Sequence, residues 1–592
     1  MARLPLLLLL LLTFTCRSQN NIPVRPYQIP HWAKGIVWYQ IFPERFRNGD
    51  TANDPRAGEV PRAERYGHWQ VHPWNSDWFE VKPYERSFSD RFYDVVYQRR
   101  YGGDLIGVME KLDYLQDLGI DAIYFNPLFE APSLHKYDGA TFHHIDNNFG
   151  RDSRGDLRRL ATARETEDPS TWIWTSADSV FLELIHEAHK RHIRIVIDGV
   201  FNHTGTAFFA FKDVLEKGKA SRYADWYDVT AWDDPETPTN EFDYKGWWGV
   251  KGLPEFYEDE NGFRPAVWDY IFHATKRWMD PDGDGDPSDG IDGWRLDAAA
   301  QVAPVFWKKW YARVKALNPQ ALIVAELWDD ASGAVKDARF DGAMNYPFAY
   351  AMTDYFIDRA TAISSDELAR RLTALYHNYG KQTLNVLWNL IDSHDTDRVA
   401  SMILNPDLNF DRQRSPKDNP DYVLRKPDAR ERRIQKQIAA FQMTFPGAPL
   451  IYYGTEAGMW GSDDPDDRKP MLWDDMDYDN EKHHPLPGHS RPDDANYFDR
   501  QLFNYYRSLI ALRKHNPALQ TGDFQVARSL TDTDLFAFYR RSPEQTLLVV
   551  FNRSDTVLPL KQPVGTSWRV VHGSGTSTVP ARGFMVLEVV KK

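Results

Sequence analysis

The sequence predicts an α/β protein: a (β/α)8 TIM barrel with an insertion after the third strand and a C-terminal antiparallel β-sandwich. The first observation is that carboxylates follow apolar runs rich in β-branched residues, which are typical of buried parallel strands. Ile195-Val196-Ile197 precedes Asp198, Leu322-Ile323-Val324 precedes Glu326, and the run from Leu384 to Leu390 precedes Asp395. Each of these acids therefore lies where a strand is predicted to end.

The second observation is the spacing of the acids. Asp297 and Glu326 are 29 positions apart, and Glu326 and Asp395 are 69 apart, which is close to one and two strand-helix units of roughly 30 residues. Acids at the carboxyl ends of regularly repeated strands indicate a (β/α)8 barrel, whose active site is built from those ends. Asp198 and Asp297 are 99 positions apart, which is too long for one unit and predicts the insertion.

The first barrel elements follow in order. Residues 35–42 are predicted as the first strand and residues 121–127 as the second. Between them, Asp104 is a start signal for a helix whose apolar residues recur at i, i+3 and i+4. A helix with Phe181, Leu184, Ile185 and Ala188 on one face leads into the strand that ends at Asp198.

Two further regions depart from the strand-helix pattern. Residues 204–267 are rich in Trp, Asp, Pro and Gly and form the predicted insertion. Short alternating runs after Gly522 predict the sandwich, the third observation behind the fold. No repeat of 20 to 50 residues is present, which excludes a solenoid. The predicted units are an export signal (1–18), a barrel in two parts (30–203 and 268–515), the insertion (204–267) and the sandwich (520–592).

Composition narrows the functional classes. With 592 residues the chain has room for one barrel and one or two smaller domains. A net charge of −14 and a pI near 5.7 argue against a nucleic-acid or anionic-membrane surface. The 21 Trp and 29 Tyr residues suit the apolar faces of sugar rings. Most of these rings are nevertheless expected in the core.

The N-terminus resembles an export signal, because Arg3 precedes a Leu-rich run that is too short to span a bilayer. We therefore expect a periplasmic, cell-surface or extracellular protein without a transmembrane helix in the mature chain. Cys16 is the only cysteine, so no disulfide is expected. A cysteine here also fits a lipoprotein signal, but Thr13 and Thr15 match the usual Leu-(Ala/Ser)-(Gly/Ala)-Cys box poorly. Plain secretion is favoured over a lipid anchor.

Four of the acid-bearing segments resemble the signature regions of the α-amylase superfamily (glycoside hydrolase family 13). They read Asp198-Gly-Val-Phe-Asn202-His203, Gly293-Trp-Arg295-Leu-Asp297, Ala325-Glu326-Leu-Trp328 and Ser393-His394-Asp395-Thr-Asp-Arg398. Further matching segments, in the same order, are residues 38–41, 134–138, 340–348 and 447–456. Residues 344–348 and 463–470 are similar to the neopullulanase and cyclomaltodextrinase branch. In this family the insertion is the B domain, which forms one wall of the cleft.

The resemblance implies the roles of three acids. Breaking a glycosidic bond needs an acid for the leaving oxygen and a carboxylate facing the anomeric carbon. By resemblance Asp297 is the nucleophile, Glu326 is the acid and later the base, and Asp395 fixes substrate hydroxyls, so the mechanism retains configuration. For any one of these residues alone, an ordinary buried ion pair at a strand end is an equal alternative. Taken together with the basic neighbours, the three acids favour catalysis.

The neighbours of the acids are also carried over. Arg295 lies two positions before Asp297 on one strand, so both side chains face the same side, and the guanidinium is expected to lower the pKa of Asp297. Glu326 is expected to hold its proton near neutrality. The residues predicted to contact substrate are Tyr137 beneath the sugar ring, His203 and His394 on hydroxyls, Asp198 in support of Arg295, and Arg398.

A calcium site is predicted in the loop after the first strand. Asn48, Asp50, Asn53 and Asp54 gather four hard oxygen side chains within seven residues. In the resembling branch this loop binds structural Ca²⁺ together with a carbonyl and an acid from a segment that here contains Gly102 and Asp104. The alternative is that Asp104 only caps a helix and the loop is a solvated turn. The acidic stretch at residues 282–289 lacks the EF-hand Gly and Glu, which favours a plain surface turn.

The predicted function is cleavage of α-1,4-glucosidic bonds in starch-type glucans, maltooligosaccharides or cyclodextrins. A glucanotransferase or isomerase that uses the same intermediate is one alternative; a non-catalytic glucan-binding or partner protein is another, but it would have lost Asp297 or Glu326. Residues 298–301 and 253–256 differ from the branch pattern, and both stretches shape acceptor subsites. The first barrel strand begins too soon after the signal for the extra N-terminal sandwich that pairs protomers in that branch, so a monomer is favoured.

Overall fold

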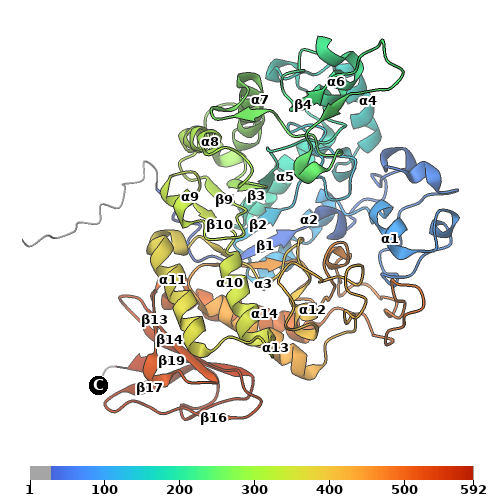
Figure 1. Ribbon diagram of the computed structural model, residues 1–592. Coiled ribbons are helices and arrows are strands. Elements are labelled where there is room, and N and C mark those ends of the chain that lie inside the picture. Colours follow the sequence, from blue (N-terminus) through green and yellow to red (C-terminus); the bar gives the residue numbers. More distant parts are fainter. Residues whose placement is uncertain (1–27, 591–592) are drawn as a thin grey trace, which may run out of the picture.

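The computed structural model describes residues 28–590 and confirms the predicted fold class (Figure 1). Eight parallel strands form one sheet in the order β10-β9-β8-β3-β2-β1-β12-β11. A parallel bridge between Met344 and Trp388 joins the two ends of this sheet and closes the barrel. The strands are β1 Trp38–Ile41, β2 Ala122–Phe125, β3 Arg194–Gly199, β8 Gly293–Leu296, β9 Leu322–Ala325, β10 Gly342–Ala343, β11 Trp388–Asn389 and β12 Ala448–Tyr452. The predicted export signal, with Cys16, lies outside the described residues.

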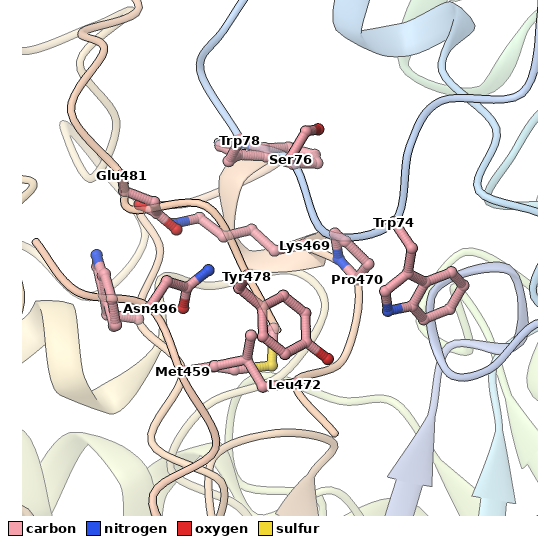
Figure 2. Close-up of a pocket in the computed structure, with 11 residues that line it drawn as sticks. Trp74, Ser76, Trp78, Met459, Lys469, Pro470, Leu472, Tyr478, Glu481 and Asn496 are labelled. Atoms are coloured by element: carbon pink, nitrogen blue, oxygen red, sulfur yellow. The ribbon is translucent and has the colours of Figure 1, made fainter. Parts of the chain in front are cut away.

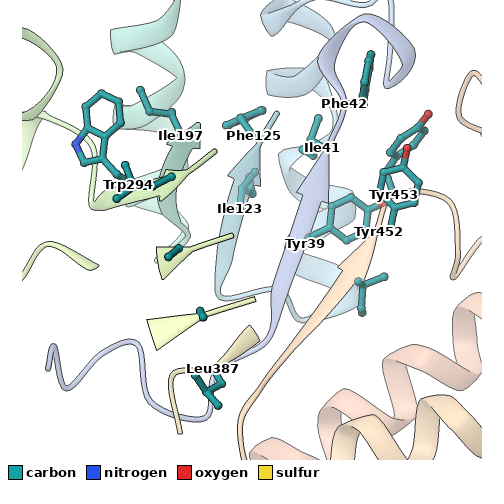
Figure 3. Close-up of a cluster of buried hydrophobic side chains, with 14 of the residues drawn as sticks. Tyr39, Ile41, Phe42, Ile123, Phe125, Ile197, Trp294, Leu387, Tyr452 and Tyr453 are labelled. Carbon is teal, nitrogen blue, oxygen red and sulfur yellow. The ribbon is translucent and has the colours of Figure 1, made fainter. Parts of the chain in front are cut away.

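Alternation along the barrel strands separates two buried clusters. One cluster consists almost entirely of strand residues, including Tyr124, Val196 and Val324, and fills the barrel interior. Residues at the intervening positions face the helices, and Figure 3 shows several of them: Tyr39, Ile41, Ile123, Phe125, Ile197 and Trp294. Because successive side chains of a strand alternate between faces, the inward row of β3 continues from Val196 to Asp198, and that of β9 from Val324 to Glu326. The strand period thus aims the acids into the mouth of the barrel.

Helices cover the outside of the barrel. They are α2 Leu105–Glu110, α3 Leu112–Leu118, α4 Ser153–Ala163, α5 Ser176–Lys190, α7 Pro265–Met279, α8 Pro304–Leu317, α9 Ser332–Lys336, α10 Tyr346–Met352, α11 Ser365–Leu384, α12 Val399–Leu404, α13 Ala429–Thr444, α14 Arg500–Lys514 and α15 Pro517–Thr521. The strand expected at residues 384–390 is shorter than predicted, because α11 extends through Leu384 and only Trp388–Asn389 pair as β11. A short apolar run fits a helix end as well as a strand.

The segment between β3 and α7 forms the inserted structure at the top of the molecule in Figure 1. It contains α6 Phe209–Lys217 and two small hairpins, β4 Val229–Ala231 with β5 Asp243–Tyr244 and β6 Glu258–Asp259 with β7 Gly262–Phe263. Antiparallel bridges join His203 to Glu255 and Tyr227 to Phe256. The inserted segment is therefore fastened directly beside the end of β3.

A second lobe follows β1 and was not anticipated from the sequence. Residues 42–104 contain only short helical turns and α1 Phe92–Val95, yet they enclose a core of their own. This core includes Tyr66, Trp78 and Phe92 and is completed by Tyr422 from the connection between α12 and α13. Without a long periodic element, a segment of this kind carries no strong local signal.

The C-terminal region is antiparallel, as predicted. Its main sheet has the order β13-β14-β15-β19-β17, with β13 Asp523–Val526, β14 Leu535–Arg541, β15 Thr546–Asn552, β17 Ser567–His572 and β19 Gly583–Val590. One face packs against the barrel through rings such as Phe441 and Phe551, 4.9 Å apart. The other face packs against the pair β16 Leu558–Pro559 and β18 Thr578–Val579. Among residues 28–590, no helix has the length and apolarity needed to cross a bilayer.

Candidate active site

An open cleft lies at the carboxyl ends of the barrel strands. The predicted acids Asp297, Glu326 and Asp395 all line it. Its aromatic walls come from the loops after β2, β3 and β9 and comprise Tyr137, Trp247, Trp248 and Trp328, with His135 and His203 between them. The arrangement fits an elongated ligand with apolar ring faces and many hydroxyl groups.

Arg295 is the centre of the acidic cluster. It follows Trp294 on β8 and is fully buried. Its Nη1 donates to both oxygens of Asp198 at 3.0 Å and to Oδ1 of Asp297 at 2.9 Å. Its Nη2 lies 3.0 Å from Oε1 of Glu326. One guanidinium thus positions both proposed reacting carboxyls, and their placement on one side of β8 and β9 agrees with the strand alternation.

Glu326 has two further donors. The backbone N–H of Ala298 donates to Oε2 at 3.1 Å, and Nε1 of Trp328 donates to Oε1 at 3.2 Å. Ala298 adopts φ 47°, a left-handed conformation that costs an alanine of the order of 1 kcal/mol. This strained turn directly after Asp297 is what directs the amide toward Glu326. The nucleophile candidate and the acid candidate are therefore held by one local backbone feature as well as by Arg295.

Asp395 also lines the cleft and follows β11 along the chain. Its Oδ2 lies 3.2 Å from Nε2 of His394, and its Oδ1 lies 3.5 Å from Nη2 of Arg468. Arg468 also donates from Nε to the carbonyl of His394 at 2.7 Å. Arg468 thus donates to a carboxylate that stays partly open to the cleft, as a group that binds sugar hydroxyls requires.

Tyr137, Asp198 and His394 form one hydrogen-bonded chain. The Tyr137 hydroxyl donates to Oδ2 of Asp198 at 3.1 Å, and its ring stacks on that of His394 at 5.5 Å and 8°. Nε2 of Gln40 donates to Nδ1 of His394 at 2.9 Å. This bond assigns the ring proton to Nε2, which faces the Tyr137 hydroxyl. Asp198 does not line the cleft and acts through Arg295 and Tyr137.

Burial dominates the electrostatics of the acids. It raises the pKa of the Asp297 carboxyl well above the usual range, the charge of Glu326 adds to this shift, and Arg295 opposes it. The effect of Arg295 therefore has the expected sign but is outweighed by burial and by the charge of Glu326. Burial, together with Glu326, also raises the pKa of Asp395 to about 7. The cleft consequently retains a proton at pH values where isolated carboxyls lose it.

His203 is placed to bind a ligand. It is 1 % exposed and lines the cleft, and its Nε2 has no hydrogen-bond partner. Its ring lies 5.2 Å from that of Trp247 at 24°. Burial lowers the pKa of His203 to about 4, so the imidazole is neutral. A buried, unpaired ring nitrogen at a cleft wall is suited to a sugar hydroxyl.

Arg398 lies in a different place from the one predicted. Its guanidinium is fully buried and donates to the carbonyls of Asp467 at 2.8 Å and Tyr453 at 2.7 Å. These bonds hold the loop after β12, and Arg398 does not line the cleft. Arg468, which the sequence analysis did not assign, takes the wall position beside Asp395. Its signal was present in the branch-like segment at residues 463–470.

A small pocket lies apart from the three acids and is lined in part by Lys469, the residue after Arg468 (Figure 2). Lys469 projects into it and contacts Glu481 at 2.7 Å. Glu481 also pairs with Arg491 at 2.9 Å. Trp74 and Trp78, from the lobe after β1, complete the lining. This buried ion-pair network holds the loop against the lobe, so it stabilises the Arg468 wall without facing the cleft.

The predicted calcium loop is compact and keeps two oxygen atoms free. Oδ1 of Asn48 and Oδ1 of Asn53 are buried without a hydrogen-bond partner. Gly102 has φ 75°, and a Cβ there would lie 2.1 Å from Oδ1 of Asp54, so only glycine allows this approach. Burial raises the pKa of Asp54 and of Asp104 to about 6. Unpaired oxygens among buried acids fit a hard cation.

Asp104 both caps α2 and holds the loop at residues 48–54. Its Oδ1 caps α2 by accepting from the amide of Gly107 at 2.6 Å. Its oxygens also accept from the amides of Gly49 at 3.1 Å and Asp50 at 3.0 Å, and from Nδ2 of Asn53 at 2.9 Å. The cap and the loop are thus one connected structure.

Two other groups could hold a metal ion among the described residues. His143, His144 and Glu165 form one, and their ligand atoms lie within 4.8 Å of one another. The exposed turn at residues 280–289 provides the other, through Asp280, Asp282 and Asp289. The second group is the predicted acidic turn, and exposed acids of this kind commonly bind no ion.

The barrel, the shared arginine and the paired acids define a glycoside hydrolase, and the comparisons place it. The model of the α-amylase catalytic domain matches residues 40–168 and 176–522, so the chain belongs to the α-amylase family. Neopullulanase 2 of Thermoactinomyces vulgaris is 35 % identical over 548 residues, covering 92 % of this chain and 74 % of that protein. Cyclomaltodextrinase of Geobacillus thermopakistaniensis is 32 % identical over 538 residues, covering 91 % and 72 %.

A solved structure agrees with this placement. The ligand-free cyclic alpha-maltosyl-(1-->6)-maltose hydrolase of Arthrobacter globiformis aligns with a TM-score of 0.69 at 25 % identity, covering 95 % of this chain and all of that one. The chain is thus a glucan hydrolase of the neopullulanase and cyclomaltodextrinase type.

Proposed function

We propose that this protein cleaves α-1,4-glucosidic bonds with retention of configuration. This proposal rests on one observation: the buried guanidinium of Arg295 contacts both Asp297 and Glu326, which line an open cleft. Paired carboxyls of this kind serve double displacement, in which one is the nucleophile and the other the acid and base. The names of the relatives, neopullulanase and cyclomaltodextrinase, support linear and cyclic α-glucans as substrates.

The reaction would proceed in two steps. Glu326 donates its proton to the glycosidic oxygen as the bond to the anomeric carbon breaks, and a carboxylate oxygen of Asp297 bonds to that carbon. The departing sugar leaves as an alcohol. Glu326, now ionised, takes a proton from water, whose oxygen attacks the anomeric carbon and releases Asp297. Asp395 holds sugar hydroxyls through both steps.

The donor contacts stabilise each carboxyl in the step in which it is ionised. Burial raises the pKa of Asp297, and Arg295 opposes this shift by donating to the carboxylate, which favours the ionised form at the moment of attack. The donors to Glu326, Ala298 N–H and Trp328 Nε1, stabilise the charge that this residue carries after it has given up its proton. The same contacts are then in place when Glu326 acts as the base.

The test is the anomeric form of the first product. Proton NMR within the first minutes of maltotriose or β-cyclodextrin hydrolysis should show the α-anomer at the new reducing end, before mutarotation. An initial β-anomer would refute retention. Product chromatography on starch, pullulan and β-cyclodextrin then separates hydrolysis from transfer, since a transferase or isomerase would yield longer or rearranged glucans in place of free sugars.

We also propose that the loop at residues 48–54 holds a structural Ca²⁺. The unpartnered Oδ1 atoms of Asn48 and Asn53 support it, together with the carboxylates of Asp50, Asp54 and Asp104. The ion would neutralise part of this negative charge and fix the loop on α2. Elemental analysis of the purified protein, before and after treatment with a chelator, should find one Ca²⁺ per chain that the chelator removes.

A further inference from the structure

Three potential ligand atoms converge at a second place, on residues that do not line the cleft. His143 and His144 lie in the loop after β2, and Glu165 lies in the connection between α4 and α5. Oε2 of Glu165 lies 2.8 Å from Nε2 of His144 and 3.4 Å from Nε2 of His143. Both histidines are almost fully buried, with 3 % and 2 % of their side chains exposed, and that of Glu165 is 13 % exposed.

Each of these side chains has its other polar atom bound elsewhere. Nδ1 of His143 lies 2.7 Å from Oγ1 of Thr141 and 2.9 Å from the hydroxyl of Tyr270. Oε1 of Glu165 accepts from the amide of Ile173 at 2.7 Å. The outer bonds leave the inner atoms to face one another.

His144 is oriented in the same way. Its Nδ1 lies 2.9 Å from Oδ2 of Asp178, and that carboxylate accepts from Arg277 at 3.1 Å. A carboxylate that receives the outer N–H of a histidine is the usual support of a metal-binding imidazole, since it sets the tautomer and raises the basicity of the inner nitrogen. The ring of His143 is fixed as well, stacked on Trp172 at 4.2 Å and 4°.

We propose that His143, His144 and Glu165 bind a divalent transition metal, with Zn²⁺ as the best fit. Two imidazoles and one carboxylate match its ligand preference, and a water molecule would take the fourth position on the side where Glu165 is open. Tetrahedral bonds of about 2.05 Å place ligand atoms about 3.3 Å apart. The two separations above lie within about 0.5 Å of that value.

A metal at this site would connect segments that support the cleft. The loop after β2 carries Tyr137 six residues before His143, and Tyr270 belongs to α7, the first element after the inserted segment. Asp178 lies in the first turn of α5. A metal here would therefore join the Tyr137 loop, the connection before α5 and, through Tyr270, the base of the insertion. None of the three residues lines the cleft, so the site would be structural.

The competing arrangement is a hydrogen-bonded network without metal. In it, protonated His144 bridges Glu165 and Asp178, and the same distances hold. The two arrangements differ in one measurable respect: only the first binds one equivalent of a transition metal at these three residues.

Cobalt(II) provides the probe, because its visible d–d absorption reports coordination by nitrogen and oxygen, and Ca²⁺ gives no such signal. The full chain without a tag is stripped with dipicolinate and titrated with Co²⁺. We expect one equivalent to give visible bands, one equivalent of Zn²⁺ to abolish them, and Zn²⁺ to raise the melting temperature. In the variants Glu165→Gln and His143→Ala we expect the bands to weaken at least tenfold.

Two controls make the result decisive. His489→Ala alters a surface histidine whose ring stacks on His484 at 5.1 Å, and it should leave the titration unchanged. Glu165→Gln keeps the size of a partly exposed side chain, so circular dichroism should show an intact fold. The proposal fails if the parent shows no stoichiometric Co²⁺ bands, or if the two site variants titrate like the parent.

Discussion

Replacing Asp395 by asparagine should make the protein more stable at alkaline pH while abolishing most activity. In the native state burial and the charge of Glu326 raise the pKa of this carboxyl from 3.8 to about 7. In the unfolded chain the Asp395 carboxyl releases its proton near pH 4. Between about pH 4 and pH 7 the native state therefore holds a proton that the unfolded state has lost. Wild-type stability attributable to this group is therefore complete below pH 4 and is lost as the pH rises to 7.

The size of the effect follows from the interval. Each pH unit above 3.8 costs the native state about 1.4 kcal/mol until the native carboxyl ionises near pH 7. From pH 5 to pH 8 the penalty grows by two units, or about 3 kcal/mol without screening. The Asp395 side chain is 28 % exposed, and solvent screening reduces this to about 1 kcal/mol. Asparagine has no charge, so the variant lacks the penalty.

The assay compares melting temperatures at pH 5 and pH 8. For a folded unit of several hundred residues, about 1 kcal/mol corresponds to about 1 °C. The melting temperature of Asp395→Asn minus that of the parent should thus be about 1 °C higher at pH 8 than at pH 5. Asp90→Asn removes a carboxyl from a side chain that is 78 % exposed and serves as the control, with no pH-dependent difference. A difference for Asp395→Asn that is constant with pH, or larger at pH 5, would refute the reasoning.

Three other outcomes are expected. Asp297→Asn and Glu326→Gln should each lower kcat by at least about 10² to 10⁴-fold with the fold intact by circular dichroism, and retention of a tenth of the parent rate by either would contradict its role. Trp248→Ala should raise KM for maltoheptaose several-fold and leave kcat within about twofold. This side chain is 78 % exposed and lines the cleft, and stacking of an aromatic ring on a sugar is worth about 1 kcal/mol. An unchanged KM would show that Trp248 does not bind substrate. Chelation should lower the melting temperature and Ca²⁺ restore it, whereas Asp50→Asn should reproduce the chelated state, and a melting curve indifferent to both treatments would exclude a stabilising ion.

Local patterns were sufficient for the barrel and for the acids. Val196 and Asp198 lie two positions apart on one strand, as do Val324 and Glu326, and alternation alone sends each pair to the barrel interior. The left-handed turn at Ala298 had no comparable signal, because alanine rarely adopts that conformation. The position of Arg398 was wrong for a related reason: its hydrogen-bond partners are backbone carbonyls of a loop more than fifty residues away.

The amino-acid sequence by itself determined the barrel, the inserted segment, the antiparallel C-terminal sheet and the identity of the acids, because strand period and repeat spacing are local properties of the chain. Only the tertiary structure decided which residues face the cleft and how strongly each acid holds its proton. Arg295 meets four carboxylate oxygens from three strands, and burial outweighs its charge at Asp297. Burial and long-range contact are created by folding, so no segment read alone contains them.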